Sequence, residues 1–566
     1  MRYHALACDY DGTIATNGRV PDSTVESLQR VAASGRKLIL VTGRRIDELA
    51  GVFPRLNLFD RIVAENGAVV YNPRTREEKL FGEPPPSTFL DNLRMRRVEP
   101  LSVGKVIVAT WQPHETVVLD AVRESGLELQ VIFNKGAVMV LPSGINKAFG
   151  LRAALHELEL SVHNTVGIGD AENDQAFLSA CECSAAVANA LDAVKERTDI
   201  TTRGDHGDGV EELIVELLKD DLQGYGLQRH HILLGRNGEG PEIDLPPYGT
   251  SLLIAGPSGS GKTTVLTAIL ERLSKAAYQF CIVDPEGDYG GFEHAVVLGD
   301  ERRLPSTEEV LQLLSRFENA VVVLLGVPLG DRPAFAEQLL QRLIAFQSRT
   351  GRPHWIILDE AHHLMPASHG PVPNGGLQNF GSSVLVTVHP ERVSQAALQT
   401  INSVAAVGTT PVATLAEFVR SANLPCLPWP EIELEQLEIL LWQRKRSRAS
   451  PLRVRIEPAE AELRRHRRKY SEGDLQERSF HFRGPKGKLN LRAQNLALFV
   501  QIAEGIDDET WIYHLRRGDY SAWMQSAVKD KAMAGQVALI ERAKLSPRES
   551  RAKIKAVIEK LYTGSA

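Results

Sequence analysis

Carboxylate side chains directly follow two apolar stretches in the N-terminal part of the chain, where they could carry out phosphoryl transfer. Asp9 and Asp11 lie in DYDGT after one apolar run, and Asp170 and Asp174 lie in GDAEND after TVGIG. One carboxylate can attack phosphorus and form an acyl phosphate, while another can protonate the leaving oxygen and later activate water. The pattern predicts a phosphomonoester hydrolase with Asp9 as the nucleophile and Asp11 as the general acid and base.

Two further segments could bind the phosphate of such a substrate. Thr42 lies in VTGR at the end of the apolar run 37–41, and Lys147 lies in INKAFGL. A hydroxyl and an ammonium group can both contact phosphate oxygens, and the ammonium offsets their charge. We therefore predict that Thr42 and Lys147 belong to the same site.

A hard cation such as Mg²⁺ takes oxygen ligands, so these carboxylates could also hold a metal beside the phosphate. Asp9 and Asp170 are the expected ligands, and Asp174 is expected to complete the shell. Taken singly, DYDGT could be an ordinary turn, Lys147 a surface lysine and GDAEND a loop or helix cap. All four segments in this order, each after an apolar run, favour a functional site.

A glycine-rich segment, GPSGSGKT at 256–263, matches the phosphate-binding pattern GxxxxGK[ST]. It follows the apolar run SLLIA and precedes the helical pattern TVLTAILERL, which is the setting that the motif requires. Backbone N–H groups can cradle phosphates there, Lys262 can reach the terminal phosphates, and Thr263 can ligate Mg²⁺. The residues expected to contact ATP are Gly256, Pro257, Ser258, Gly259, Ser260, Gly261, Lys262, Thr263 and Thr264.

An acidic pair in HWIILDEAHHL could complete this nucleotide site. Asp359 follows an apolar run and could join the Mg²⁺ shell, while Glu360 could polarise the attacking water. Carboxylates also favour helix N-termini, which is the ordinary interpretation of such a pair. If Glu360 acts as a base on water, the site favours nucleotide hydrolysis over a kinase reaction, in which an acceptor hydroxyl would be positioned instead. Thr387 or His389, in SSVLVTVHPERV, could lie near the γ-phosphate, although His389 could equally be an ordinary strand-end histidine.

Alternating apolar runs and helical patterns predict two parallel-sheet α/β domains, followed by a mostly helical module. The first is expected to be a Rossmann-like phosphatase that contains an inserted segment, and the second a RecA-like P-loop ATPase. The predicted boundaries are 1–83 and 146–217 for the phosphatase core, 84–145 for the inserted segment, 226–425 for the ATPase, 427–480 for a basic bridging segment and 485–566 for the helical module.

The N-terminal motifs resemble the haloacid-dehalogenase superfamily, specifically its Cof-like class with a type-2 cap, including phosphoglycolate-phosphatase-like members. ENGA at 65–68, VANALDAV and GDGV at 207–210 also resemble that class. The resemblance implies that Asp11 reaches the metal through its backbone carbonyl. It also implies that residues 84–145 form the cap and that the cap selects the substrate. Because this cap is short, the resemblance implies that a small phosphorylated metabolite is preferred to a macromolecule.

The second domain resembles the HerA/FtsK-like ATPases through HILLGRN, VDPEGDY, LDEAHHL and VTVHPERV. The resemblance implies a second acidic position at Glu286. It also implies a homo-oligomer in which one subunit supplies an arginine to its neighbour, with Arg392 and Arg420 as candidates. The chain departs from the DNA-pumping members because phosphatase-like motifs stand where those proteins have an N-terminal barrel.

Two basic runs, WQRKRSR at 442–448 and RRHRRKY at 464–470, could contact a nucleic-acid backbone. They could also be solvated helical faces, and the few aromatics among them, Trp442 and Tyr470, give little support to base stacking. In the tail, Trp511, Leu515 and Trp523 are expected to pack a small helical domain.

Composition sets limits on the alternatives. The chain has 566 residues, a net charge of −6 and five scattered cysteines, and we find neither a signal peptide nor an apolar run long enough for a membrane span. A cytoplasmic protein is expected, with the lone CxC of Cys181 and Cys183 in the core. Two alternatives remain open: a kinase and phosphatase that processes nucleic-acid ends, and an assembly whose oligomeric form depends on the nucleotide.

Overall fold

The computed structural model describes residues 1–238, 240–368, 380–425, 428–444, 450–457, 459, 479–485, 487, 489–528, 531–543 and 545–559. These form two compact units, Met1–Gly287 with His294–Pro458, and Asp288–Glu293 with Ala459–Ala566. Within the described ranges, no helix is long and apolar enough to span a membrane. Cys426, the basic run at 464–470 and most of the run at 442–448 lie outside the described residues.

An eight-stranded sheet occupies the N-terminal part, in the order β12-β11-β10-β1-β2-β3-β4-β5. Strands β12 to β3 are parallel, and β4 and β5 are antiparallel. The strands are β1 (Ala5–Asp9), β2 (Lys37–Val41), β3 (Arg61–Ala64), β4 (Val69–Asn72), β5 (Glu77–Leu80), β10 (Thr165–Gly169), β11 (Cys183–Ala186) and β12 (Ile200–Thr201). The helices are α1 (Asp22–Ala33), α2 (Ile46–Val52), α5 (Lys147–Glu157), α6 (Gln175–Ala180), α7 (Asp192–Lys195) and α8 (His206–Asp220).

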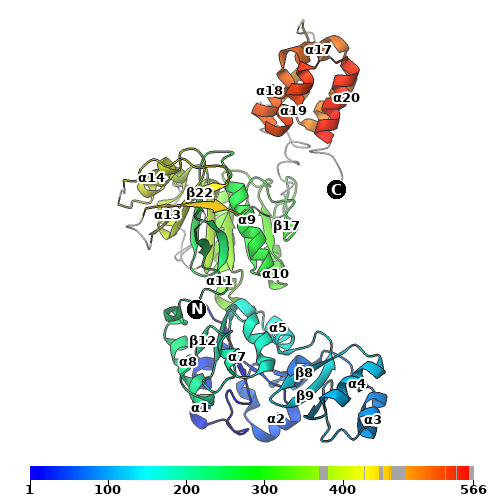
Figure 1. Cartoon of the computed structure of the whole chain (residues 1–566). Helices are drawn as coiled ribbons and strands as arrows, with labels where there is room; N and C mark the ends of the chain where they lie inside the picture. The colour runs from blue at the N-terminus through cyan, green and yellow to red at the C-terminus, as the bar shows by residue number, and fades with distance from the viewer. Residues whose placement is uncertain are drawn as a thin grey trace. The chain divides into compact units, whose positions relative to one another are not determined.

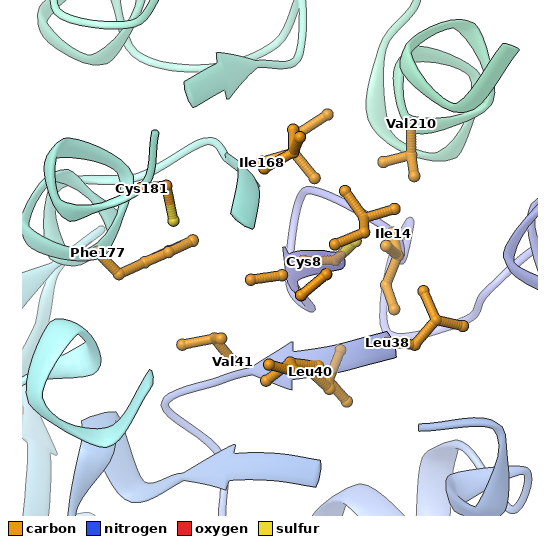
Figure 2. Packing of buried hydrophobic residues seen from close by; sticks show 14 of the residues in the cluster. Cys8, Ile14, Leu38, Leu40, Val41, Ile168, Phe177, Cys181 and Val210 are labelled. Carbon is orange, nitrogen blue, oxygen red and sulfur yellow. The ribbon is translucent and has the colours of Figure 1, made fainter. Parts of the chain in front are cut away.

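The centre of this sheet is apolar on both faces. Every residue of β1 and β10 is buried, as expected for parallel strands covered by helices on both sides. Figure 2 shows Cys8 and Ile168 packed with Phe177 of α6 and Val210 of α8. Cys181 lies in the same cluster as a free thiol. Burial raises its pKa to about 12, so it is an inert core residue.

A separate four-stranded antiparallel sheet, β6-β7-β9-β8, lies between β5 and α5 in the chain. Its elements are α3 (Ser87–Met95), β6 (Ser102–Val103), β7 (Val108–Trp111), α4 (Glu115–Ser125), β8 (Leu129–Asn134) and β9 (Ala137–Pro142), with β8, β9, α3 and α4 labelled in Figure 1. We call this segment the cap. Lys135 and Gly136 join β8 to β9 with φ of 46° and 87°, which is a two-residue hairpin turn of type I′.

An eleven-stranded sheet follows, in the order β14-β13-β23-β22-β21-β15-β20-β19-β16-β18-β17. The strands are β13 (Ile232–Arg236), β14 (Glu242–Leu245), β15 (Ser251–Ala255), β16 (Phe280–Asp284), β17 (Val296–Leu298), β18 (Ala320–Val323), β19 (Trp355–Leu358), β20 (Ser382–Thr387), β21 (Ser403–Ala406), β22 (Glu438–Gln443) and β23 (Leu452–Ile456). The helices are α9 (Lys262–Lys275), α10 (Thr307–Ser315), α11 (Arg332–Thr350), α12 (Ala361–Leu364), α13 (Gln395–Thr400) and α14 (Pro411–Ser421).

Strands β22 and β23 fall in the segment that the charge pattern marked as a bridge. They pair antiparallel with each other, β22 also pairs with β21, and β23 with β13, so they extend the parallel sheet. The apolar run EILLW supplies buried side chains, and Trp442 is buried in the core of this domain. Trp442 is therefore not available to stack on a nucleic-acid base.

The second unit contains a short hairpin and a group of helices. These are β24 (Phe480–Phe482), β25 (Leu491–Ala493), α16 (Leu496–Gly505), α17 (Asp508–Arg517), α18 (Asp519–Trp523), α19 (Lys531–Arg542) and α20 (Pro547–Ile558). Trp511, Leu515 and Trp523 lie in its hydrophobic core, as predicted. Ser546 caps α20 and exchanges hydrogen bonds with Glu549 in a capping box.

Candidate functional site

The acidic segments of the N-terminal part meet at one edge of the eight-stranded sheet. Strand β1 pairs with β2 on one side and β10 on the other, with Asp9 opposite Val41 and Cys8 opposite Ile168. All three strands are parallel, so the residues that follow them lie at the same carboxyl edge. Asp9 is the last residue of β1, and Asp170 directly follows β10.

Lys147 lies between two carboxylates of this edge. Its Nζ donates to Asp9 Oδ1 at 2.6 Å and to Asp174 Oδ1 at 2.5 Å, and all three side chains are at most 5% exposed. Asn146 caps α5 by accepting from the Phe149 N–H, which fixes Lys147 at the first position of the helix. Asp174 is held in turn because its Oδ2 accepts from the backbone N–H groups of Asp170 and Ala171, each at 2.9 Å.

The buried charges in this cluster shift one another's protonation. Burial and then the charge of Asp174 raise the pKa of Asp9 well above its usual value, against the opposing effect of Lys147. Burial alone would lower the pKa of Lys147, but Asp174 and Asp9 outweigh it and raise that pKa. The site thus holds excess negative charge that a cation would stabilise.

The donor set fits a magnesium ion. Asp9, Asp170 and Asp174 each offer a carboxylate oxygen, and these oxygens lie within 4.8 Å of one another. Burial first, together with the charge of Asp174, raises the pKa of Asp170, which is the direction expected where carboxylates crowd without enough counter-charge. Buried oxygen ligands of this kind suit a hard divalent cation.

Asp11 is held by an arginine that sequence reasoning missed. Arg44 donates from Nε and Nη2 to the two oxygens of Asp11 at 2.6 and 2.7 Å, a bidentate ion pair. The Arg44 N–H also donates to Thr42 Oγ1 at 3.1 Å, which leaves the Thr42 hydroxyl proton for another acceptor. The only sequence signal for Arg44 was its place in VTGR, two residues after Thr42.

A second missed residue comes from the cap. Lys135, at the turn between β8 and β9, makes a short ion pair with Asp170, whose other oxygen accepts from Thr13 Oγ1 at 3.2 Å. A Cβ on Gly12 would lie 2.9 Å from Lys135 Nζ and 2.3 Å from Asp170 Oδ2. Gly12, with φ of 87°, is therefore needed where the cap lysine approaches the DYDGT loop.

The nucleotide motif forms the loop expected of it. Gly256, Gly259 and Gly261 all have positive φ, and α9 begins at Lys262. Lys262 Nζ donates to the carbonyls of Gly256 and Pro257 at 3.0 and 2.9 Å, so its ammonium lies inside the loop that would cradle phosphates.

Sheet order brings the acidic pair toward this loop. Strand β20 lies between β15, which leads into Gly256, and β19, which leads into Asp359. Ala255 is opposite Thr387 in the β15–β20 register. Glu360 caps α12 with φ of 43°, a left-handed conformation that is strained for a non-glycine residue.

Thr387 and His389 lie at the carboxyl end of β20. Thr387 Oγ1 accepts from the His389 N–H at 3.0 Å and lies 3.1 Å from Nδ1 of His362. Burial and then the charge of His363 lower the pKa of His362 to about 4, so its imidazole is neutral near pH 7. Thr387 is thus in contact with His362 and with the backbone of His389, and of these two histidines only His389 was singled out from the sequence.

Both arginine candidates have exposed side chains beside a glutamate. Arg392 is 66% exposed beside Glu391, and Arg420 is 72% exposed and pairs with Glu417 at 2.6 Å. Such exposure suits a residue that would act on a neighbouring subunit, and nothing in one chain chooses between them.

Replacing Lys147 by Met should destabilise the N-terminal part strongly. The change leaves Asp9 and Asp174 buried without their shared cation, a loss of about 3–5 kcal/mol when one partner of a buried pair is removed. Urea unfolding would show this as a lower midpoint. The matched control is Lys219→Met, since Lys219 is 63% exposed and its pair with Glu216 is screened by water, so the variant should unfold at nearly the wild-type midpoint. Equal midpoints for both variants would contradict the buried-pair description.

Comparison with known proteins adds independent information. Residues 6–86 and 105–214 match the model of haloacid dehalogenase-like hydrolases, and residues 248–381 match that of an AAA domain. A phosphoglycolate phosphatase of Methanobrevibacter smithii is 25% identical over 38% of this chain and 98% of its own length. Phosphoglycolate phosphatase 2 of Saccharolobus solfataricus is 30% identical over 38% of this chain and 93% of its own length.

A haloacid dehalogenase-like hydrolase of Bacteroides thetaiotaomicron, known from its crystal structure, is 21% identical, with a TM-score of 0.34 and coverage of 38% of this chain and 99% of that one. The family follows from the matches of sequence given above and not from this structural similarity. The chain belongs, through its N-terminal part, to the haloacid dehalogenase-like hydrolases, and carries an AAA-type P-loop ATPase domain in the same polypeptide.

Proposed function

We propose that the N-terminal part hydrolyses phosphomonoesters through an aspartyl phosphate on Asp9, and that the P-loop domain hydrolyses ATP. The single observation that carries the first proposal is the buried cluster of Asp9, Asp170 and Asp174 with oxygens within 4.8 Å of one another, at the carboxyl edge of the sheet. The named relatives are phosphoglycolate phosphatases, so the proposed substrate class is a small phosphorylated metabolite.

In the first step, an oxygen of the Asp9 carboxylate attacks phosphorus, and the bond from phosphorus to the substrate oxygen breaks. Asp11 gives its proton to that departing oxygen. In the second step, Asp11 takes a proton from water, the water oxygen attacks phosphorus, and the bond between phosphorus and Asp9 breaks. Inorganic phosphate leaves, and both carboxylates return to their starting states.

The contact between Arg44 and Asp11 bears on these two roles. The guanidinium of Arg44 donates to both oxygens of Asp11 and so occupies the atoms that would move the proton. In each step one Asp11 oxygen must face the substrate or the attacking water, so the Arg44 contact has to open. Arg44 is 30% exposed, which leaves it room to turn away.

Asp9, Asp170 and Asp174, with the backbone carbonyl of Asp11, would hold Mg²⁺. Bound there, the ion would neutralise charge on the phosphate oxygens and orient phosphorus toward Asp9. Thr42 would donate its hydroxyl proton to a phosphate oxygen, and the ammonium of Lys147, which donates to Asp9, would offset negative charge beside the phosphate.

In the ATPase domain, Lys262 would contact the terminal phosphates, and Thr263 and Asp359 would hold the nucleotide's Mg²⁺. Glu360 would orient the attacking water, and its strained backbone at φ of 43° is a reason to place it in the site. We further propose a HerA-like motor class for this domain, with assembly of several copies through it.

Changing Asp11 to Asn should trap the aspartyl phosphate. Asparagine cannot take a proton from water, so the second step should slow by about 10²–10⁴-fold, whereas p-nitrophenyl phosphate has a leaving group that needs no protonation in the first step. Intact-mass spectrometry after brief incubation should find one phosphoryl group per chain, and peptide mapping should place it on Asp9. The proposal fails if the variant turns over substrate with no covalent phosphoryl group, or carries one on another residue.

A further inference from the structure

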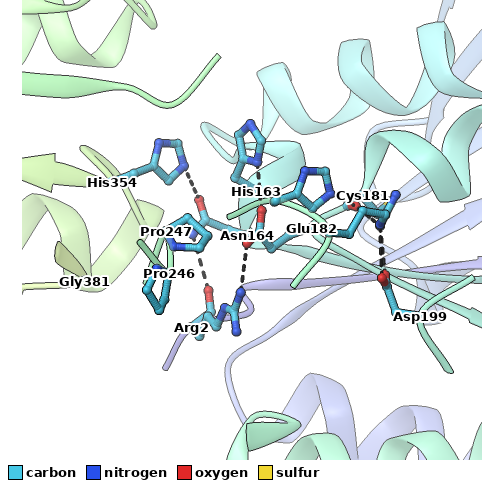
Figure 3. Close-up of polar contacts among 12 residues, drawn as sticks. Arg2, His163, Asn164, Cys181, Glu182, Asp199, Pro246, Pro247, His354 and Gly381 are labelled. Carbon is cyan, nitrogen blue, oxygen red and sulfur yellow. Dashed lines mark hydrogen bonds and ion pairs between the residues drawn. The ribbon is translucent and has the colours of Figure 1, made fainter. Parts of the chain in front are cut away.

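A cluster of titratable side chains away from both sites links the N-terminal sheet to the P-loop domain, within one compact unit. Glu182 is at its centre, with 2% of its side chain exposed. Its Oε1 accepts from Arg2 Nη2 at 2.8 Å, and its Oε2 accepts from the Tyr278 hydroxyl at 2.7 Å and lies 2.9 Å from His163 Nδ1. Figure 3 shows His163, Glu182 and Arg2 in contact, close to His354.

Both ring nitrogens of His163 face an oxygen atom. Its Nε2 lies 2.8 Å from the carbonyl oxygen of Ala276, which only accepts. Its Nδ1 lies 2.9 Å from Oε2 of Glu182. With Nε2 directed at the backbone carbonyl, Nδ1 and the carboxylate oxygen are placed to be ligands of one metal ion.

His230 shares one of these features with His163, the contact between Nε2 and a backbone carbonyl. Its Nε2 lies 3.1 Å from the carbonyl oxygen of Cys181, so it carries hydrogen there and keeps its lone pair on Nδ1. Ligand atoms of His163, Glu182 and His230 lie within 4.8 Å of one another. Imidazoles whose far nitrogen donates to a backbone carbonyl are the usual form of metal-binding histidines, because that bond fixes the tautomer and the ring orientation.

A neighbouring histidine gives the contrast. His354 Nδ1 accepts from the Gln279 N–H at 2.9 Å, and its Nε2 lies 3.2 Å from Asn164 Oδ1, which accepts. One donor and one acceptor satisfy the neutral ring, so His354 needs no cation. Burial in this region therefore does not by itself place a ring nitrogen against a carboxylate, as it is placed in His163.

We propose that His163, Glu182 and His230 form a site for a divalent transition metal, with zinc as the preferred ion. Two imidazoles and one carboxylate are an established zinc ligand set, in which water or another group takes the fourth position. With bonds of about 2.0 Å to the ion, the ligand atoms of a tetrahedral zinc site lie about 3.3 Å apart. His163 Nδ1 and Glu182 Oε2 are 2.9 Å apart, so these two atoms would separate by only a few tenths of an ångström when zinc binds.

The residues around His163, Glu182 and His230 give a metal ion a route to the site and indicate what a bound ion would do. A cavity of about 400 Å³, lined by Arg2, His163, Glu182 and Tyr278 among others, reaches the cluster, so an ion can enter without unfolding the chain. Ala276 and Tyr278 directly follow α9, the helix that begins at Lys262, so the bound ion would fix the end of the nucleotide-binding helix against the N-terminal sheet.

Elemental analysis of the full chain tests the proposal. After incubation with zinc and dialysis into metal-free buffer, the wild type should retain one zinc per chain, and Co²⁺ in its place should give visible absorption typical of a four-coordinate site. His163→Asn and His230→Asn should each weaken zinc binding by about 10–100-fold or more. His230 is only partly buried, so its variant is the one expected to keep the fold, checked by circular dichroism.

Two matched variants separate this site from other metal binding. His231→Asn changes the adjacent histidine, which pairs with Asp244 instead, and should retain the zinc. Asp170→Asn alters the carboxylate cluster of the N-terminal site and should also retain it. A wild type without zinc, or folded His163 and His230 variants that keep it, would overturn the proposal.

Discussion

Asp9→Asn should reduce phosphomonoester hydrolysis by about 10⁴-fold or more while ATP hydrolysis continues at the wild-type rate. The amide has nearly the shape of the carboxylate, but it is a poor nucleophile and cannot form the acyl phosphate, so the first step is lost. The variant should also fold well, because it removes one negative charge from a cluster in which burial first, and then the charges of Asp174 and Asp170, raise the pKa of Asp9. Phosphate release and ATP turnover, measured on the same preparation, check the prediction.

A suitable control is Asp192→Asn, which changes a carboxylate whose side chain is 95% exposed. This variant should keep both activities. If Asp9→Asn retained phosphatase turnover, another residue would be the nucleophile. If it also abolished ATP hydrolysis, the two sites would not work independently.

Lys262→Ala should produce the reverse pattern. ATP hydrolysis should fall by about 10²–10³-fold, the usual effect of removing one group that stabilises transition-state charge. The ammonium now bonds the carbonyls of Gly256 and Pro257, so its loss leaves the loop without the cation that would contact the phosphates. Phosphatase turnover should remain unchanged, since Lys262 begins α9 beside the eleven-stranded sheet and the Asp9 cluster lies at the edge of the eight-stranded sheet.

The exposed Lys275, at the other end of the same helix, provides the matched control, and Lys275→Ala should keep full ATP hydrolysis. Radiolabelled ATP at saturating concentration separates loss of turnover from loss of binding. A Lys262→Ala protein that hydrolysed ATP normally would place the nucleotide chemistry elsewhere in the chain.

The parts of the fold that follow from local pattern were predictable. Runs of β-branched and aliphatic residues predicted the buried strands β1, β10, β15 and β19. The helical patterns between these runs predicted that the strands are parallel. Residues after such strands lie at one edge of the sheet. That rule explains why Asp9 and Asp170, far apart in sequence, are close in space.

Contacts that depend on packing between segments were not predictable. Lys135 reaches Asp170 only because it lies in a hairpin turn of the cap. A lysine followed by a glycine in the sequence does not predict that contact. Strands β22 and β23 could not be recognised in the sequence, because charged residues dominate the composition of 427–480 around them. Pairing of β23 with β13, more than 200 residues earlier by sequence number, has no local signal.

The most direct test of the central claim is phosphate release by the Lys262→Ala protein with Mg²⁺, using a panel of small phosphorylated metabolites and a 3′-phosphorylated DNA. We predict release from at least one small metabolite, no release when Asp9→Asn is added to Lys262→Ala, and little release from DNA. Release that persists in the double variant, or none from any phosphomonoester, would contradict a phosphatase acting through Asp9, and preference for DNA ends would instead support end processing.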